Sequence, residues 1–352
     1  MTSRQRVRLV LDHEEPDRVP IHDTPWERTV ARWHREGLPA DQSPHSYFGY
    51  ELAYQGPDIS LQFPEEVLEE GEGWRIARSP LGAVQKTFTD HESIPQMLEF
   101  AINSPEQWEQ HKHRLAWNDS RVDWDGALAA NRSLRQGELF VCYFAHIGYD
   151  WLQRIIGAET MLMALAQDRA WVREMMDTLM DLVLRGLDEM LARGFEFDGA
   201  FVANDLGYRN GTFFSPAVFR EVEFPAQQRM YATCRDHDLP VILHSCGNVR
   251  EFVPLLIEAG LTCLNPLESK AGMDVVGLKR EFGDWLAFMG GIDVRAMADP
   301  DPSAIEREIA RKVPVAKQDG GYIYHSDHSI PDNVSWQQYL RVIDLVREYG
   351  GY

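Results

Sequence analysis

The chain has 352 residues, a hydrophobic fraction of 44% and a formal net charge of −20. This acidic balance, with no cluster of Lys or Arg, argues against a nucleic-acid partner. No apolar run reaches 18 residues, and the basic residues 1–8 lead into the acidic residues 12–15 where a signal peptide would be apolar, so we expect no membrane span and a cytoplasmic location.

Short apolar, β-branched or aromatic segments alternate with longer helical patterns along the whole chain. The predicted strands are residues 19–22, 59–61, 139–144, 199–203, 241–244, 262–265, 286–289 and 322–325. The predicted helices are residues 150–156, 170–193, 216–237, 249–259, 275–282, 303–313 and 335–349. Alternating strands and helices imply a parallel sheet, and eight such units favour a closed (β/α)₈ TIM barrel of the α/β class.

Residues 62–125 depart from this alternation. Residues 74–77 and 83–87 flank a turn-like segment at 79–82, and a helix is expected to start at Ser104. We therefore predict an inserted β-hairpin and helix, and a single barrel domain over residues 1–352.

The candidate functional residues lie where the predicted strands end. In a (β/α)₈ barrel the carboxyl ends of the strands carry the active site. Nearly every predicted strand delivers an ionisable or metal-binding side chain there: His22 and Asp23, His146, Asn204 and Asp205, His244 and Cys246, Asn265 and Glu268, Asp293, and the segment from His325 to His328.

His244 and Cys246 are the strongest candidates, because alternate residues of a strand point the same way and both are preferred zinc ligands. The glycine that follows, Gly247, lets the backbone turn away just after the pair. A buried core Cys beside a hydrogen-bonded His is the simpler alternative. His328 could supply a third ligand across the barrel mouth, with His325 or Asp327 as competitors.

Asp205 and Glu268 are candidates for a fourth ligand, or for a catalytic base or an orienting carboxylate. Their structural alternatives are helix caps, or ion pairs with Arg209 and Lys270. The candidate substrate-binding residues are Tyr143, His146, Asn204, Asp293 and His22, although Asp293 could equally cap the following helix. We interpret Cys142, Cys234 and Cys263 as core residues, and no disulfide framework is expected.

Several of these segments resemble the uroporphyrinogen decarboxylase superfamily. The matching segments are residues 4–7 and 15–20, 205–208 with 215–220, 244–248, 265–268 with 271–274, and 290–293. The resemblance covers essentially the whole chain and implies a (β/α)₈ barrel. It also implies one of two activities, a metal-free porphyrinogen decarboxylase or a zinc-dependent methyltransferase that exchanges methyl groups with a corrinoid.

Two places in the sequence favour the methyltransferase branch. Decarboxylases carry an arginine-rich segment after the first strand, and here residues 23–28 are acidic and aromatic instead. The resemblance to the methyltransferases assigns zinc ligands to His244 and Cys246. Their third ligand is a Cys after the last strand, where this chain has Asp327, His328 and Ser329.

The resemblance therefore implies a zinc-dependent methyltransferase or demethylase that acts on a small ether, amine or thiol. The corrinoid is expected on a separate partner protein, because the chain has no DxHxxG segment of the cobalamin-binding kind. Replacing a Cys ligand by His leaves zinc more positive, which favours activation of a neutral oxygen or nitrogen. A metal-free decarboxylase and a metal-assisted hydrolase or lyase on the same barrel remain alternatives, and a homodimer is one expectation for the assembly.

Overall fold

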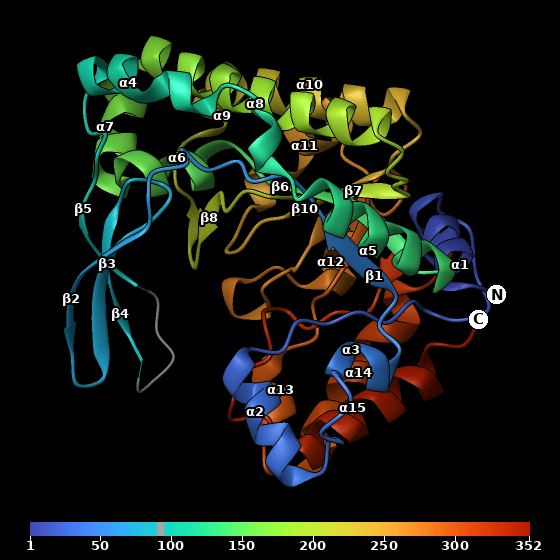
Figure 1. The fold of residues 1–352 in the computed structure, drawn as a ribbon. Helices are drawn as coiled ribbons and strands as arrows, with labels where there is room; N and C mark the ends of the chain where they lie inside the picture. The colour runs from blue at the N-terminus through green and yellow to red at the C-terminus, as the bar shows by residue number, and fades with distance from the viewer. Residues whose placement is uncertain (90–94) are drawn as a thin grey trace.

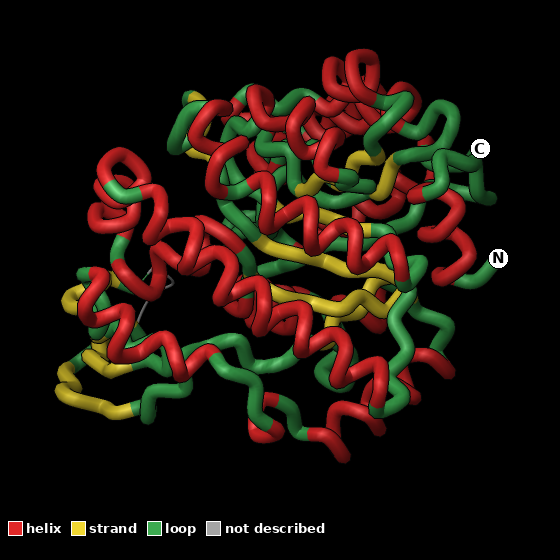
Figure 2. Tube along the Cα trace, turned by 90° about the horizontal axis from the view of Figure 1, so that it is seen from above, coloured by secondary structure: helices red, strands yellow, loops and turns green. Residues whose placement is uncertain are grey.

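The fold is described from a computed structural model that covers residues 1–89 and 95–352. Its centre is a curled, seven-stranded parallel sheet in the order β1-β6-β7-β10-β11-β12-β13 (Figure 2). The strands are β1 (Leu52–Gln55), β6 (Phe140–His146), β7 (Gly199–Ala203), β10 (Val241–His244), β11 (Cys263–Asn265), β12 (Ala287–Met289) and β13 (Tyr322–Ile323). Because all neighbouring pairs are parallel, every carboxyl end lies on one rim.

Helices cover the outside of this sheet (Figures 1 and 2). They are α1 (Ser3–Leu11), α2 (Glu27–Glu36), α3 (Pro44–Phe48), α4 (Pro105–His111), α5 (Trp124–Gln136), α6 (Gly148–Ile156), α7 (Ala158–Gln167), α8 (Arg169–Ala192), α9 (Pro216–Val222), α10 (Phe224–Asp236), α11 (Val253–Ala259), α12 (Val275–Phe282), α13 (Val294–Ala298), α14 (Pro302–Ala316) and α15 (Trp336–Tyr349). Helices cover one face of the sheet, and its own side chains fill the other. Such a sheet needs apolar residues on both faces. In agreement, β7 is buried at all five of its positions.

The predicted alternation of strands and helices is confirmed, with β7 and β10 at the predicted bounds. The predicted strand at 59–61 is wrong, because β1 lies earlier, at Leu52–Gln55, and pairs with β6. Residues 59–61 are buried but form a loop after Pro57, in which Ser60 N donates to the Asp58 carboxylate at 2.8 Å.

Residues 19–22 also form no named strand. They make a single parallel bridge, from Ile21 to Tyr324, and the Ile21 carbonyl accepts from Glu51 N at 3.0 Å. Pro20 has no N–H to donate, so fewer inter-strand backbone hydrogen bonds can form at this point. The parallel sheet of the described residues therefore has seven strands, one fewer than predicted.

The single helix predicted at 216–237 is two helices, α9 and α10. Ser215 caps α9 as expected, since its hydroxyl accepts from Val218 N at 3.3 Å. The break follows from Pro225, which cannot donate a helical hydrogen bond and crowds the preceding turn.

The predicted hairpin is part of a four-stranded antiparallel sheet, which projects from the parallel sheet in Figure 1. Its strands are β2 (Glu66–Gly71), β3 (Trp74–Arg78), β4 (Val84–Phe88) and β5 (Gln96–Glu99). The predicted helix is α4, and the Ser104 hydroxyl accepts from Gln107 N at 3.3 Å. Residues 90–94, inside the predicted insertion, lie outside the described residues. Among the helices of the described ranges, none has the length and apolar character needed to cross a membrane.

Candidate functional site

His244 and Cys246 converge at the end of β10. The Cys246 Sγ lies 3.4 Å from His244 Nε2. The next residue, Gly247, has a φ of 79°, and a Cβ there would lie 2.3 Å from the carbonyl carbon of Gly207. Glycine is therefore required for the chain to turn away while both side chains stay on the rim.

Asn265 fixes the orientation of the His244 ring. It is the register partner of His244 on β11, and its Oδ1 lies 2.7 Å from His244 Nδ1. Because Asn265 Nδ2 donates to the Met289 carbonyl at 3.1 Å, Oδ1 is the acceptor, so Nδ1 carries the ring proton. The lone pair of Nε2 then faces Cys246, as in histidines that bind metals.

The ligand atoms of three further side chains, Asp205, Glu268 and His328, lie near one or both members of this pair. Those of Asp205, His244 and Cys246 lie within 4.8 Å of one another, and so do those of Cys246, Glu268 and His328. Asp205 Oδ1 also accepts from Cys246 N at 2.8 Å, which ties the loop after β7 to the loop after β10. The two groups share Cys246, and neither of them contains both His244 and His328.

The electrostatics of this group favour a bound cation. Burial raises the pKa of the Cys246 thiol well above its usual value, and Asp205 and Glu268 raise it further. Burial and the neighbouring Lys270 lower the pKa of His328. A divalent cation would offset the two carboxylates and favour the thiolate, and imidazole, thiolate and carboxylate are the ligand types of zinc. The residues present therefore fit zinc.

The two competitors of His328 face elsewhere. His325 is 5% exposed, and its Nδ1 donates to the Ser326 carbonyl at 2.6 Å. Asp327 is fully buried, and its carboxylate accepts from Ser269 N at 2.9 Å and from Val294 N at 3.0 Å. Neither belongs to the groups of convergent ligand atoms found in the described part of the chain.

The structure buries two of the predicted substrate contacts, Tyr143 and Asn204, in hydrogen bonds with other elements. The Tyr143 hydroxyl donates to the Val183 carbonyl of α8 at 2.6 Å, so this side chain faces the helices instead of the rim. Its neighbour Phe144 points the other way, as strand alternation requires. Asn204 is also fully buried, where its Oδ1 accepts from Asp150 N and its Nδ2 donates to Glu223.

The other three predicted contacts differ in their surroundings. His22 is 3% exposed, and its Nδ1 has no hydrogen-bond partner within residues 1–89 and 95–352, while burial lowers its pKa well below the usual value. His146 is half-buried, and its ring stacks on Trp151 with centroids 4.6 Å apart. Asp293 caps α13 through Arg295 N and pairs with the Arg295 guanidinium, which is the structural role considered for it.

A cavity of about 1010 Å³ opens between the inserted sheet and the β6–α6 side of the parallel sheet. Phe144, His146 and Trp151 line it from the parallel sheet, and Leu81 and Met97 line it from the insertion. Sequence reasoning missed this cavity, because it depends on how the insertion folds over the rim.

Comparisons with known proteins place the chain in a family. The family model of uroporphyrinogen decarboxylase (URO-D) matches residues 100–349, which is well over half of the chain. The chain belongs to the URO-D family. Its structure is similar to that of a methyltransferase from Methanosarcina mazei, with a TM-score of 0.70, 14% sequence identity and 99% of each chain covered. At this identity the likeness shows the fold alone. None of the curated proteins matches its sequence.

Proposed function

We propose that this URO-D family protein is a zinc-dependent methyltransferase or demethylase. It would move a methyl group between a small ether, amine or thiol and a corrinoid carried by a partner protein. The observation that carries the proposal is a pair of ligand groups that share Cys246: one joins it to Asp205 and to a His244 ring whose Nε2 faces it, and the other joins it to Glu268 and His328. The structurally similar protein's description as a methyltransferase supports the same reaction class.

In this proposal His244, Cys246 and His328 hold the zinc, and Asp205 and Glu268 are the catalytic carboxylates. Zinc held there would supply Lewis-acid chemistry toward a heteroatom of the substrate. When the methyl group leaves, the heteroatom keeps the bonding electron pair and takes up a proton. A carboxyl group at Glu268 or Asp205 would hold that proton, and in the reverse direction the same carboxylate would accept it.

Metal analysis of protein purified without added metal tests the proposal. We expect about one zinc per chain, lost in His244→Ala, and methyl transfer that requires a corrinoid. Wild-type protein without stoichiometric zinc would favour the metal-free decarboxylase. Turnover without any corrinoid would instead favour a metal-assisted hydrolase or lyase.

We also propose that residues 19–22 complete the barrel as its eighth strand. Three backbone hydrogen bonds support this: Tyr324 N to the Pro20 carbonyl at 2.9 Å, His22 N to the Tyr324 carbonyl at 3.1 Å, and Glu51 N to the Ile21 carbonyl at 3.0 Å. They link the segment to both edges of the seven-stranded sheet. Hydrogen exchange tests this: the amides of His22 and Tyr324 should be as protected as those of β10, and exchange at the rate of exposed loops would contradict it.

A further inference from the structure

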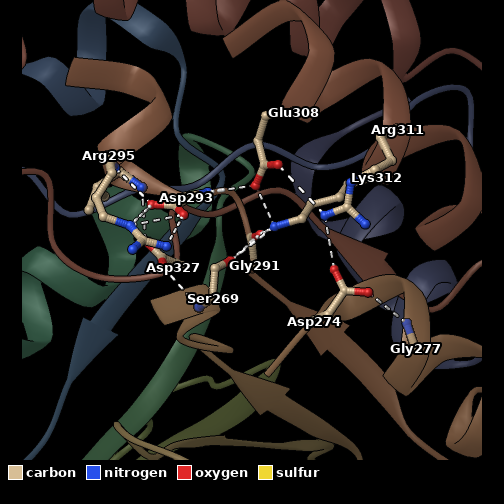
Figure 3. Close-up of polar contacts among 12 residues, drawn as sticks. Ser269, Asp274, Gly277, Gly291, Asp293, Arg295, Glu308, Arg311, Lys312 and Asp327 are labelled. Carbon is tan, nitrogen blue, oxygen red and sulfur yellow. Dashed lines mark hydrogen bonds and ion pairs between the residues drawn. The ribbon is translucent and has the colours of Figure 1, made fainter. Parts of the chain in front are cut away.

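A buried lysine of α14 joins two loops at the carboxyl ends of the strands (Figure 3). Lys312 is 2% exposed, and its Nζ donates to the Gly291 carbonyl at 2.6 Å and to Ser269 Oγ at 2.9 Å. It also pairs with Glu308 on the preceding turn of the helix. An ammonium group has three N–H donors, so these three acceptors satisfy it completely. Because Ser269 follows β11 and Gly291 follows β12, one side chain connects the two loops.

Glu308 extends this contact to the start of α13. Its carboxylate is 14% exposed and accepts from Asp293 N at 3.1 Å. A second cation, Arg311, lies 3.7 Å from it. Residues three and four apart lie on the same face of a helix. This face of α14 therefore carries the charges that contact the loops after β11 and β12.

Asp327 joins the loop after β13 to the same network. It is fully buried, and both oxygens of its carboxylate accept backbone hydrogen bonds. Oδ2 accepts from Ser269 N at 2.9 Å, and Oδ1 accepts from Val294 N at 3.0 Å. One carboxylate thus contacts both of the segments that Lys312 and Glu308 also contact.

The network adjoins two members of the candidate metal group in the sequence. Ser269 directly follows Glu268, and Asp327 directly precedes His328. The ligand atoms of Glu268, His328 and Cys246 lie within 4.8 Å of one another. Among the described ranges, none of the network's own side chains belongs to a group of convergent ligand atoms. Its effect on the metal group must therefore pass through the backbone.

We propose that Lys312 and Asp327 are positioning residues, which hold Glu268 and His328 at the separation that metal binding needs. The inference rests on the proposed function, because that function supplies the metal. Ligands must be held to within about 0.5 Å of their working geometry by the residues around them. Buried, charged hydrogen bonds suit this task, because breaking one of them leaves an uncompensated buried group.

Loss of Lys312 would release the contact between the loops after β11 and β12. Ser269 Oγ and the Gly291 carbonyl would each lose a charged donor. Of its two cationic partners, Glu308 would keep Arg311 at 3.7 Å. The loop that carries Glu268 would then be held less tightly against its neighbours.

Loss of the Asp327 charge would release the loop after β13. Asparagine has one acceptor oxygen and one NH₂ group, so in Asp327→Asn one of the two backbone N–H groups would face a donor. Either Ser269 N or Val294 N would be left without its acceptor. His328, the next residue, would lose its fixed distance to Glu268.

Lys312→Met is tested against Lys279→Met. Lys279 of α12 is also a partly buried lysine, and it donates to the Gly320 carbonyl at 2.8 Å. Gly320 precedes β13, so this contact lies at the amino end of that strand, opposite the candidate metal group. The control removes a lysine contact of similar kind without touching the loops after β11, β12 or β13.

Asp327→Asn is tested against Asp198→Asn. Asp198 directly precedes β7, and its Oδ2 accepts from Val141 N at 2.9 Å. This carboxylate also accepts a backbone hydrogen bond, but at the amino end of the sheet. The two controls therefore report what the loss of a polar contact does far from the rim.

Hydrogen exchange in metal-free protein measures the coupling of the loops without any metal. In Lys312→Met and Asp327→Asn we expect amide exchange to be roughly fivefold faster or more in residues 266–272 and 326–330. Both controls should exchange at the wild-type rate in these loops. Zinc affinity, measured by chelator competition, should fall about tenfold or more in the two test variants and stay at the wild-type value in the controls.

These readouts separate positioning from a general effect on stability. A purely stabilising role would lower the free energy of unfolding in urea and leave the zinc affinity of the folded protein unchanged. Unchanged exchange in both loops would overturn the positioning role, whether or not the protein binds zinc. Zinc affinity in the test variants equal to that of the controls would do the same.

The proposed function can fail separately. Wild-type protein that binds no zinc, while both test variants exchange faster in the two loops, would overturn the proposed function alone. Asp327→Asn keeps the size of the side chain, so it provides the answer if Lys312→Met does not fold.

Discussion

The hydrogen bond from His244 to Asn265 gives the sharpest test of the proposed metal centre. Asn265→Ala removes the acceptor of His244 Nδ1 and leaves the ring free to turn or to change tautomer. Loss of such an outer partner of a metal-binding histidine costs about 10- to 100-fold in metal affinity, which corresponds to about 1.4 to 2.8 kcal/mol.

The same substitution also destabilises the fold. Asn265 is 1% exposed, and its loss leaves the Met289 carbonyl without this donor. An unsatisfied buried group costs about 1–3 kcal/mol, so a fall in zinc affinity must be separated from a general loss of stability. The assay therefore combines chelator competition for zinc with urea unfolding of the metal-free protein.

Asn131 provides the control for that separation. It is also 1% exposed and lies away from the rim. Its Nδ2 donates to Gln55 Oε1 and to the Glu196 carbonyl, and its Oδ1 accepts from Glu196 N. Asn131→Ala should lose comparable stability and keep its zinc affinity. If Asn265→Ala binds zinc as tightly as Asn131→Ala does, the assignment of the His244 tautomer and its role in metal binding are refuted.

Four further variants test other parts of the description. Cys246→Ser should reduce zinc affinity by more than the roughly 100-fold of an outer-partner loss, because it removes a ligand; chelator competition measures this, and an unchanged affinity would remove Cys246 from the site. Tyr143→Phe should cost about 1 kcal/mol of unfolding free energy and leave kcat/KM within twofold, whereas a large loss of activity would restore it as a substrate contact. Gly247→Ala should lower the unfolding temperature and weaken zinc binding together, since its Cβ would meet Gly207. Burial raises the pKa of Glu223 to about 7, so its contribution to stability is present at low pH and is lost as the pH rises through 7. Glu223→Gln should therefore reduce the change in unfolding free energy between pH 4 and 8 by about 3 kcal/mol. A pH dependence equal to that of the wild type would contradict the raised pKa.

The sequence predicts the strands well where both faces of a strand are buried. β7 and β10 are continuous apolar runs, and both lie where predicted. β1 was missed because Leu52–Gln55 is short and has no β-branched residue, whereas residues 59–61 look like a strand yet follow Pro57 in a loop. Local composition cannot tell a buried loop from a short buried strand.

The convergence of these side chains could be predicted because strand alternation and the shared rim of a parallel sheet constrain them jointly. The same alternation argues against Tyr143, since it has the opposite parity to His146 on β6. The burial of Asn204 could not be predicted, because its partner Glu223 comes from α9's end, 19 residues away. Asn265 was noted at a strand end, but its role needs the register between β10 and β11.

The distance along the chain between Cys246 and His328 has a consequence for folding. A cation bound by both would act as a cross-link that closes a loop of about 80 residues, from the end of β10 to the end of β13. For a covalent link of that span, the loss of chain entropy in the unfolded state is worth on the order of 4 kcal/mol. Loss of such a cation would therefore lower the free energy of unfolding by an amount of this order, in addition to the loss of the binding energy itself.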